Sequence, residues 1–148
     1  MEEEVIENVQ PSRNALQSVA MSAIYDFLTY LSMKQEIDVE NIVSGLCELP
    51  YEECDYFVKA SLIMAIKHYD EAVGVFNANM RKWTFDRLNR VEQAILLLSY
   101  VHFYFVDPEV EKGVVINVAI KLSKSYLSDG DYKFVNAILD KVLVRNAE

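Results

Sequence analysis

Basic and aromatic residues alternate in one short segment, RKWTFDRLNR at positions 81–90. The segment holds four Lys or Arg residues, one acid, Trp83 and Phe85. Basic side chains can hold phosphates and aromatic rings can stack on unpaired bases. This composition therefore allows contact with single-stranded RNA, with Arg81 and Lys82 as candidate RNA-binding residues. The sequence nevertheless favours the other interpretation, a solvated segment between two helices in which Trp83 is buried.

No constellation for catalysis or metal binding is visible. The sequence has no glycine-rich phosphate loop, no G-x-S-x-G or HExxH motif and no close His–carboxylate pairing. Cys47 and Cys54 form no CxxC pair, and the two His residues, 68 and 102, are distant, so no zinc spacing exists. We expect a protein that is not an enzyme, binds no cofactor or metal, and keeps both thiols reduced.

Length and composition favour one all-α domain. The chain has 148 residues, 52% of them hydrophobic, which is enough for one core. Four Gly and three Pro are too few for the turns of an all-β fold. We expect a flexible acidic tail over residues 1–11 and a single all-helical domain over residues 12–148.

The charge is unevenly distributed along the chain. Residues 1–80 hold 4 Lys or Arg against 14 Asp or Glu, a net charge of -10, whereas residues 81–148 hold 10 against 9, a net charge of +1. A polyanion could therefore bind only a local patch in the second half. The acidic start, MEEEVIENVQ, has the wrong charge for a signal peptide, and the longest apolar run, residues 94–106, is too short for a bilayer. We expect a soluble, cytoplasmic protein with no membrane contact.

Apolar residues that recur at helical spacing predict the elements that must position these residues. The predicted helices cover 12–34 with Ser12 as N-cap, a shorter segment after Asp38, 50–80 as one kinked or two abutting helices, 89–106, 113–126 and 131–143. The segment 113–126 is rich in Val and Ile, which favour strands, but its apolar residues follow the helical period and no partner strand is evident. We therefore predict a helix there.

Three linked blocks in the second half carry a family resemblance. They read WTFDRLNRVEQAILLLSYVHFYF, VVINVAIKLSKSY and YKFVNAILDKVL, in this order and at short separations. The chain resembles the NusB family of bacterial transcription factors. The resemblance implies a compact bundle of about seven helices in two halves. It also implies binding of boxA-type single-stranded RNA together with the ribosomal protein NusE, in an antitermination complex on transcribing RNA polymerase.

The resemblance also assigns roles to residues. The candidate RNA-binding residues are Arg13, Asn14 and Gln17 in the first helix, Arg81 and Lys82, and Lys121, Lys124 and Ser125 before the last helix. The candidate partner-binding residues are Tyr25, Glu92, Tyr126 and Asp131. In the Phe-Val-Asn block, Asn136 is predicted to bond the backbone of a neighbouring segment.

Two of the partner residues also have a purely local interpretation. On the first helix, Tyr25 shares with Asn14, Ser18 and Met21 a stripe opposite the apolar face, so it should face solvent unless a tail or loop covers it. Glu92 stands three residues after Asn89, the spacing at which a Glu reaches back to the backbone of an N-cap residue. The local and functional roles of Glu92 are compatible.

This chain departs from the family pattern at several positions. Arg13 is the single basic residue where relatives carry an arginine-rich stretch, Leu97 replaces an Arg, Val118 replaces an acidic residue, and Ala137 replaces a Gly. Two alternatives therefore stay open: a protein-interaction module that keeps the NusE surface with little RNA affinity, and a stand-alone relative of the RNA-binding module of ribosomal RNA methyltransferases. The sequence does not decide whether the free protein is a monomer or a homodimer.

Overall fold

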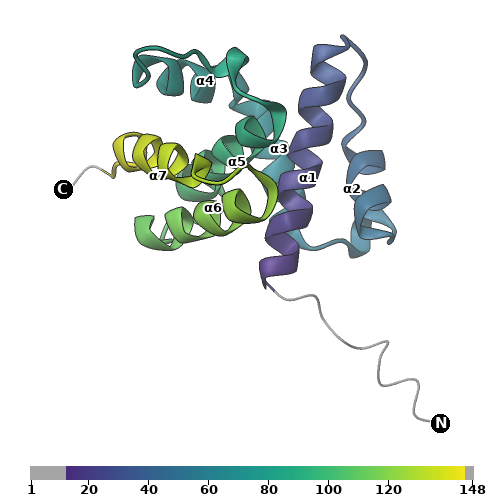
Figure 1. Cartoon of the computed structure of the whole chain (residues 1–148). Helices are drawn as coiled ribbons and strands as arrows, with labels where there is room; N and C mark the ends of the chain where they lie inside the picture. Colours follow the sequence, from purple (N-terminus) through teal and green to yellow (C-terminus); the bar gives the residue numbers. More distant parts are fainter. Residues whose placement is uncertain (1–12, 146–148) are drawn as a thin grey trace.

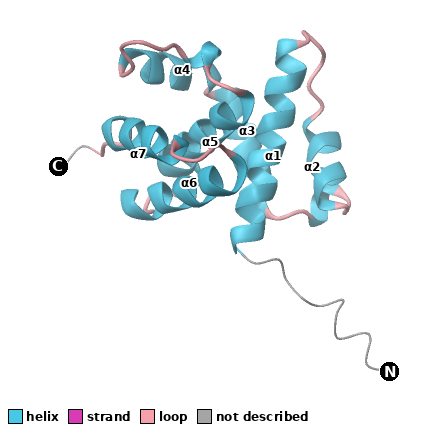
Figure 2. Ribbon diagram, in the orientation of Figure 1, coloured by secondary structure: helices cyan, strands magenta, loops and turns pink. Residues whose placement is uncertain are grey.

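The computed structural model describes residues 13–145, and in that part of the chain it contains helices and loops but no strand (Figure 2). The all-α prediction is confirmed. The α-helices are α1 (Arg13–Ser32), α2 (Val39–Cys47), α3 (Tyr56–Lys67), α4 (Tyr69–Ala78), α5 (Arg90–Val101), α6 (Lys112–Tyr126) and α7 (Asp131–Val142). Two short 3-10 helices, η2 (Tyr51–Glu53) and η3 (Phe85–Arg87), and a π-helix, η4 (His102–Val106), complete the set. The expected tail and the Ser12 cap lie outside the described residues.

Local capping sets where several helices begin. The Asp38 carboxylate accepts the backbone N–H of Asn41 at 3.0 Å, and the Asn89 side chain accepts that of Glu92 at 2.8 Å. These bonds satisfy amides that the first helical turn leaves open, so the predicted starts of α2 and α5 are confirmed. The third predicted helix begins later than expected. Pro50 precedes only the short η2, and α3 starts at Tyr56.

The segment predicted as one kinked or two abutting helices is two helices that meet at His68. The ring nitrogen Nδ1 of His68 lies 3.1 Å from the Glu71 carboxylate, a pairing that the sequence had not led us to expect. The other carboxylate oxygen of Glu71 accepts the Tyr100 hydroxyl at 2.6 Å. Burial and this bond raise the pKa of Tyr100 above its ordinary range. The start of α4 is thereby fastened to α5.

The helices enclose α5, whose apolar residues point in nearly every direction. In Figure 1, α1 and α2 lie on one side and α4, α6 and α7 on the other, with α5 between them; α5 packs against α1, α3, α6 and α7. Every residue of α5 from Ala94 to Val101 is buried. The chain is thus folded in two halves around one buried helix.

Helix α6 confirms the prediction for residues 113–126 against their strand propensity. Val115, Ala119 and Leu122 are buried on one face of this helix, and α6 packs against both α5 and α7. Burial of one apolar stripe outweighs an intrinsic preference of less than about 1 kcal/mol per residue.

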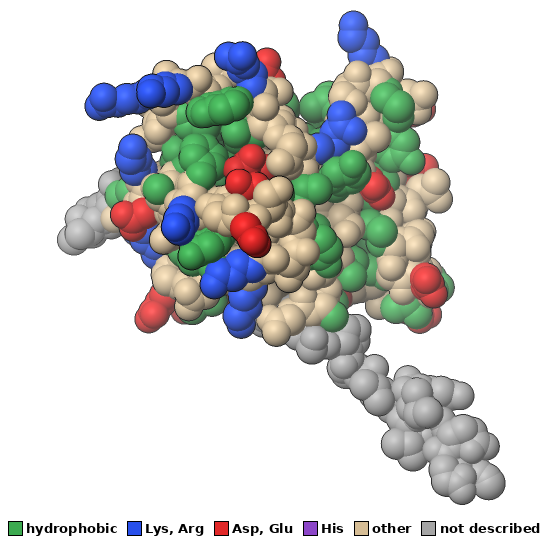
Figure 3. Space-filling model, viewed as in Figure 1, with side chains coloured by type: hydrophobic (Ala, Val, Ile, Leu, Met, Phe, Trp, Pro, Cys, Tyr) green, Lys and Arg blue, Asp and Glu red, His purple; other side chains and the backbone are tan. Residues whose placement is uncertain are grey.

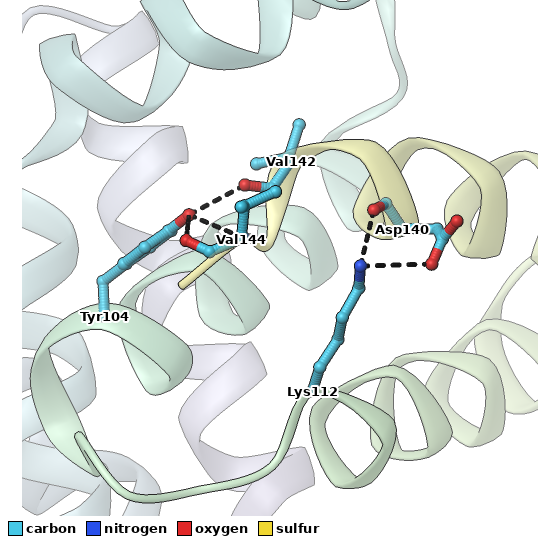
Figure 4. Close-up of polar contacts among 5 residues, drawn as sticks. All are labelled: Tyr104, Lys112, Asp140, Val142 and Val144. Carbon is cyan, nitrogen blue, oxygen red and sulfur yellow. Dashed lines mark hydrogen bonds and ion pairs between the residues drawn. The ribbon is translucent and has the colours of Figure 1, made fainter. Parts of the chain in front are cut away.

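Side-chain bonds to the backbone fasten the end of the described chain (Figure 4). The Tyr104 hydroxyl, on the π-helix, donates to Val142 O at 2.8 Å and accepts the N–H of Val144 at 3.0 Å. Lys112, at the start of α6, donates to Asp140 O at 2.7 Å and forms an ion pair with its carboxylate at 3.2 Å. These contacts hold the end of α7 against η4 and α6.

Within residues 13–145, no helix is both long enough and apolar enough to cross a bilayer.

Candidate functional site

Three neighbouring hollows form one surface, which we call the central face. The first is lined by Tyr25, Asn89, Arg90, Val91, Tyr126, Leu127 and Ser128. The second is lined by Trp83, Arg87, Leu88, Asn89, Glu92, Asp131 and Phe134, and the third by Lys124, Leu127, Ser128, Asp129, Gly130, Tyr132 and Lys133. The first hollow shares Asn89 with the second, and Leu127 and Ser128 with the third, so the three are adjacent. All four residues predicted to bind a partner therefore lie on this one surface.

The central face combines aromatic, acidic and basic groups. The view in Figure 3 shows acidic side chains near the middle of the molecule's left half, with hydrophobic and basic side chains around them. The Tyr126 ring is exposed, and the Lys124 ammonium lies 4.7 Å from the centre of the Tyr132 ring. Such a mixture of rings, charges and hollows is typical of surfaces that bind another macromolecule.

Tyr25 is on the surface as predicted, with 36% of its side chain exposed. The prediction placed Tyr25 on one exposed stripe of the first helix with Asn14, Ser18 and Met21. It is wrong for Met21, which is buried in the core. Met21 lies one helical turn before Tyr25, and only 5% of it is exposed. The predicted exposure of Tyr25 is confirmed, and its role in partner binding stays a prediction.

Arg90 of α5 is a residue that the sequence prediction missed. Its guanidinium donates to Thr29 Oγ1 and to Ser32 Oγ, each at 3.3 Å, and its central carbon lies 5.8 Å from the centre of the Tyr25 ring. Thr29 in turn donates to the Tyr25 carbonyl at 2.9 Å. Arg90 thus joins the start of α5 to α1 and holds one side of the Tyr25 ring. Its partners lie about sixty residues away in the sequence, so no local pattern could have identified it.

Glu92 is nearly buried, with 9% of its surface exposed, yet its carboxylate has no hydrogen bond or ion pair within residues 13–145. The expected bond back to the Asn89 backbone is not formed, although Asn89 caps the helix as predicted. Burial first, and then the charge of Asp131, raise the pKa of the Glu92 carboxyl. The Asp131 carboxylate also has a local role, because it accepts the N–H of Ser128 at 3.2 Å.

This position leads to a prediction on stability. The pKa of the Glu92 carboxyl is higher in the folded chain than in the unfolded chain, so the fold favours the protonated carboxyl. This stabilisation is fully present below the pKa that Glu92 has in the unfolded chain. It is lost as the pH rises through the pKa that Glu92 has in the folded chain. Glu92→Gln should therefore raise the melting temperature at pH 7, and this gain should disappear below about pH 4. Melting curves from pH 3 to 8 test this, with the exposed Glu36→Gln as the control. An equal gain at every pH would contradict the assignment.

The predicted RNA-binding residues do not form one patch. Arg81 and Lys82 are exposed in the segment after α4, at the top of Figure 1, whereas α1 begins at the bottom. Lys121, Lys124 and Ser125 are exposed at the end of α6, and Lys124 reaches the third hollow of the central face.

At the start of α1, one of the predicted RNA-binding residues is not accessible. Asn14 is exposed, but Gln17 is 5% exposed, so the expectation that it offers its amide to RNA is not met. The side chain of Arg13 lies outside what the structure describes. Asn136 also differs from its prediction: it is exposed and bonds no described residue, so the proposed backbone contact is wrong.

Trp83 lies on the surface and not in the core. Its side chain is 52% exposed and it lines the second hollow of the central face. The interpretation of residues 81–90 that buries Trp83 is therefore wrong. The core position is taken instead by Phe85, which is buried and stacks with Phe76 at 5.7 Å between ring centres.

Within the described part of the chain, no three His, Cys, Asp or Glu side chains are grouped so that they could hold a metal ion. The two cysteines are free thiols, and burial, followed by a hydrogen bond with Cys54, raises the pKa of Cys47 to about 11.

Comparisons with known proteins agree on one family. The NusB family model matches residues 13–144. The transcription antitermination protein NusB of Finegoldia magna is 29% identical over 137 residues, covering 90% of this chain and 95% of its own length, and that of Fusobacterium nucleatum is 30% identical over 115 residues, covering 74% and 71%.

Solved structures show the same fold. T. maritima NusB matches with a TM-score of 0.75 at 22% identity, covering 95% of this chain and 96% of that one. A chain in "Crystal Structure of a Plectonemic RNA Supercoil" matches with a TM-score of 0.69 at 24% identity, covering 88% and 92%. With its family match extending over nearly all of the described residues, this chain belongs to the NusB family.

Proposed function

We propose that this chain is a non-catalytic, RNA-binding transcription factor that acts in antitermination with the ribosomal protein NusE. The pair would capture boxA-type single-stranded RNA and keep it on the transcribing RNA polymerase. The relatives carry the name transcription antitermination protein NusB. One observation carries the proposal: the side chains that the resemblance assigns to a partner come from α1, α5, α6 and α7 and meet on the central face.

The mechanism that we propose is joint binding. The central face offers Tyr25 and Tyr126 as flat, partly exposed rings, and Glu92 and Asp131 as carboxylates that lack a cationic partner among the described residues. A basic side chain of NusE would neutralise the two carboxylates, and its backbone or apolar groups would cover the rings. Lys124, which lines the third hollow, and Lys121, one turn before it on α6, would then hold the RNA near the partner.

A second function is favoured by the charge distribution. With a net charge of -10 over residues 1–80 and Arg13 as the single basic residue before Lys34, the first half offers little attraction to phosphate. The chain could therefore bind NusE and contribute little RNA affinity of its own. The two functions differ in one measurable quantity, the RNA affinity that this chain adds to that of NusE.

RNA binding measured with and without NusE across a salt series tests the proposal. We expect weak binding by the free chain, with a shallow salt dependence of about 0.7 per phosphate contacted, and much tighter binding when NusE is added. Deleting residues 1–9 removes four Glu and should strengthen RNA binding modestly, because repulsion falls. Equal RNA binding by NusE alone and by the pair would favour the protein-interaction module. Tight binding by the free chain, unchanged by the deletion, would show that the basic residues of the second half suffice.

A further inference from the structure

Trp83 is an exposed aromatic residue that lines the central face but is not among the predicted partner-binding residues. It is the single tryptophan of the chain, and it lies in the segment between α4 and η3. The Arg87 guanidinium carbon lies 5.9 Å from the centre of its ring. Leaving about half of a large apolar ring in water forgoes stabilisation that burial would give, so a ring placed in this way is a candidate for binding.

The charge around Trp83 indicates what could bind there. Arg81, Lys82 and Arg87 are all exposed, and none of them forms an ion pair with any residue between 13 and 145. The one acid of this stretch, Asp86, accepts the hydroxyl of Thr84 at 2.5 Å, on the exposed side of the segment. Within residues 81–87, three positive charges stand against one negative charge, whereas Glu92 and Asp131 add two carboxylates to the hollow that Trp83 also lines. An anionic group should therefore bind along the segment and not inside the hollow.

We propose that Trp83, together with Arg87, is a stacking platform for an unpaired base of single-stranded RNA, and that Arg81 and Lys82 hold the neighbouring phosphates. This inference rests on the proposed RNA-binding function and adds to it a contact far from the start of α1. Stacking needs no particular base, because every base has a flat face, and a guanidinium strengthens it by cation–π attraction. The unpaired charges make RNA a better occupant than a second protein surface.

The hollow beside the ring can take part of a nucleotide. Its volume is about 430 Å³, and Phe134 and Leu88 form apolar parts of its lining. The carboxylates of Glu92 and Asp131 also line it, so a phosphate should stay outside, at Arg81 and Lys82, while the base enters.

The fluorescence of Trp83 reports on this site directly, because no other tryptophan contributes. We would add a boxA-type single-stranded RNA oligonucleotide to the full chain at low salt, and separately measure total RNA binding by the anisotropy of the same oligonucleotide carrying a dye. We expect the single strand to quench Trp83, and the same RNA annealed to its complement, whose bases are paired, to quench it much less. The two readouts separate stacking at Trp83 from RNA binding elsewhere.

Variants give a second and independent measurement. Trp83→Ala should weaken RNA binding about fivefold or more, the loss of one base–aromatic stack, whereas Trp83→Phe should recover most of it. Arg87→Ala should reduce both the quenching and the affinity, and Lys67→Ala, which removes one exposed positive charge from α3, serves as the matched control. Helical circular dichroism of each variant should stay unchanged, since Trp83 is not part of the core.

Three outcomes would overturn the inference, and they can be told apart. If RNA binds by anisotropy but Trp83 is not quenched and Trp83→Ala binds normally, the RNA site lies elsewhere and the proposed function stands. If NusE quenches Trp83 and RNA does not, the ring belongs to the protein interface. If the chain binds no RNA with or without NusE, both the inference and the proposed RNA-binding function fail.

Discussion

Replacing Tyr25 by Asp should weaken the complex with NusE at least about tenfold and leave the melting temperature almost unchanged. Tyr25 lines the first hollow of the central face, and its ring is partly exposed beside the Arg90 guanidinium. Central aromatic residues of this kind often contribute about 2 kcal/mol or more to an interface, which corresponds to more than a tenfold change in affinity. Titration calorimetry with NusE and thermal melting of the free variant measure the two effects.

A matched control separates the interface from a general effect of the new charge. Tyr56 is 70% exposed at the start of α3 and lines none of the three hollows. Tyr56→Asp should therefore leave both the NusE affinity and the melting temperature close to those of the parent. If Tyr25→Asp instead unfolds the chain, its ring contributes to the core. If both variants bind NusE normally, the central face is not the partner surface.

Leu97→Arg should lower the free energy of unfolding by about 3–5 kcal/mol, the largest stability effect that we predict. Leu97 is completely buried in the middle of α5, with no exposed surface. An arginine there would be an unpaired charge surrounded by apolar side chains, and its solvation could not be recovered. Chemical denaturation measures the loss. The family resemblance nevertheless implies an Arg at this position, so other chains must compensate for it.

The compensating residue can be tested in the same protein. The resemblance implies an acidic residue at 118, where this chain has Val118, which is half-buried against the core on α6. Helices α5 and α6 pack together, so an Arg at 97 and a Glu at 118 could pair. Leu97→Arg combined with Val118→Glu should be more stable than the sum of the two single changes predicts. Strict additivity would show that the two positions do not interact.

Local chemistry in the sequence determined the helices and several of their ends. Hydrogen bonds within a helix and its cap connect residues no more than about four positions apart, so their pattern is readable in the chain itself. Asp38 and Asn89 cap the helices that their positions predicted. The helix over residues 113–126 likewise followed from apolar spacing. The order and the short separations of the three sequence blocks in the second half indicated the family.

Only the tertiary structure decided which of these helical residues are exposed. Burial depends on which other helix covers a position, and helical spacing alone does not encode that. For this reason Gln17 and Met21 are buried although both were expected at the surface, and Trp83 is exposed because Phe85 occupies the core place. The joining of Tyr25 to Arg90 is also a tertiary result, since α1 and α5 must first pack before the guanidinium can reach the ring. The sequence thus named the four predicted partner residues of the central face, and the packing of α1, α6 and α7 around α5 brought them together.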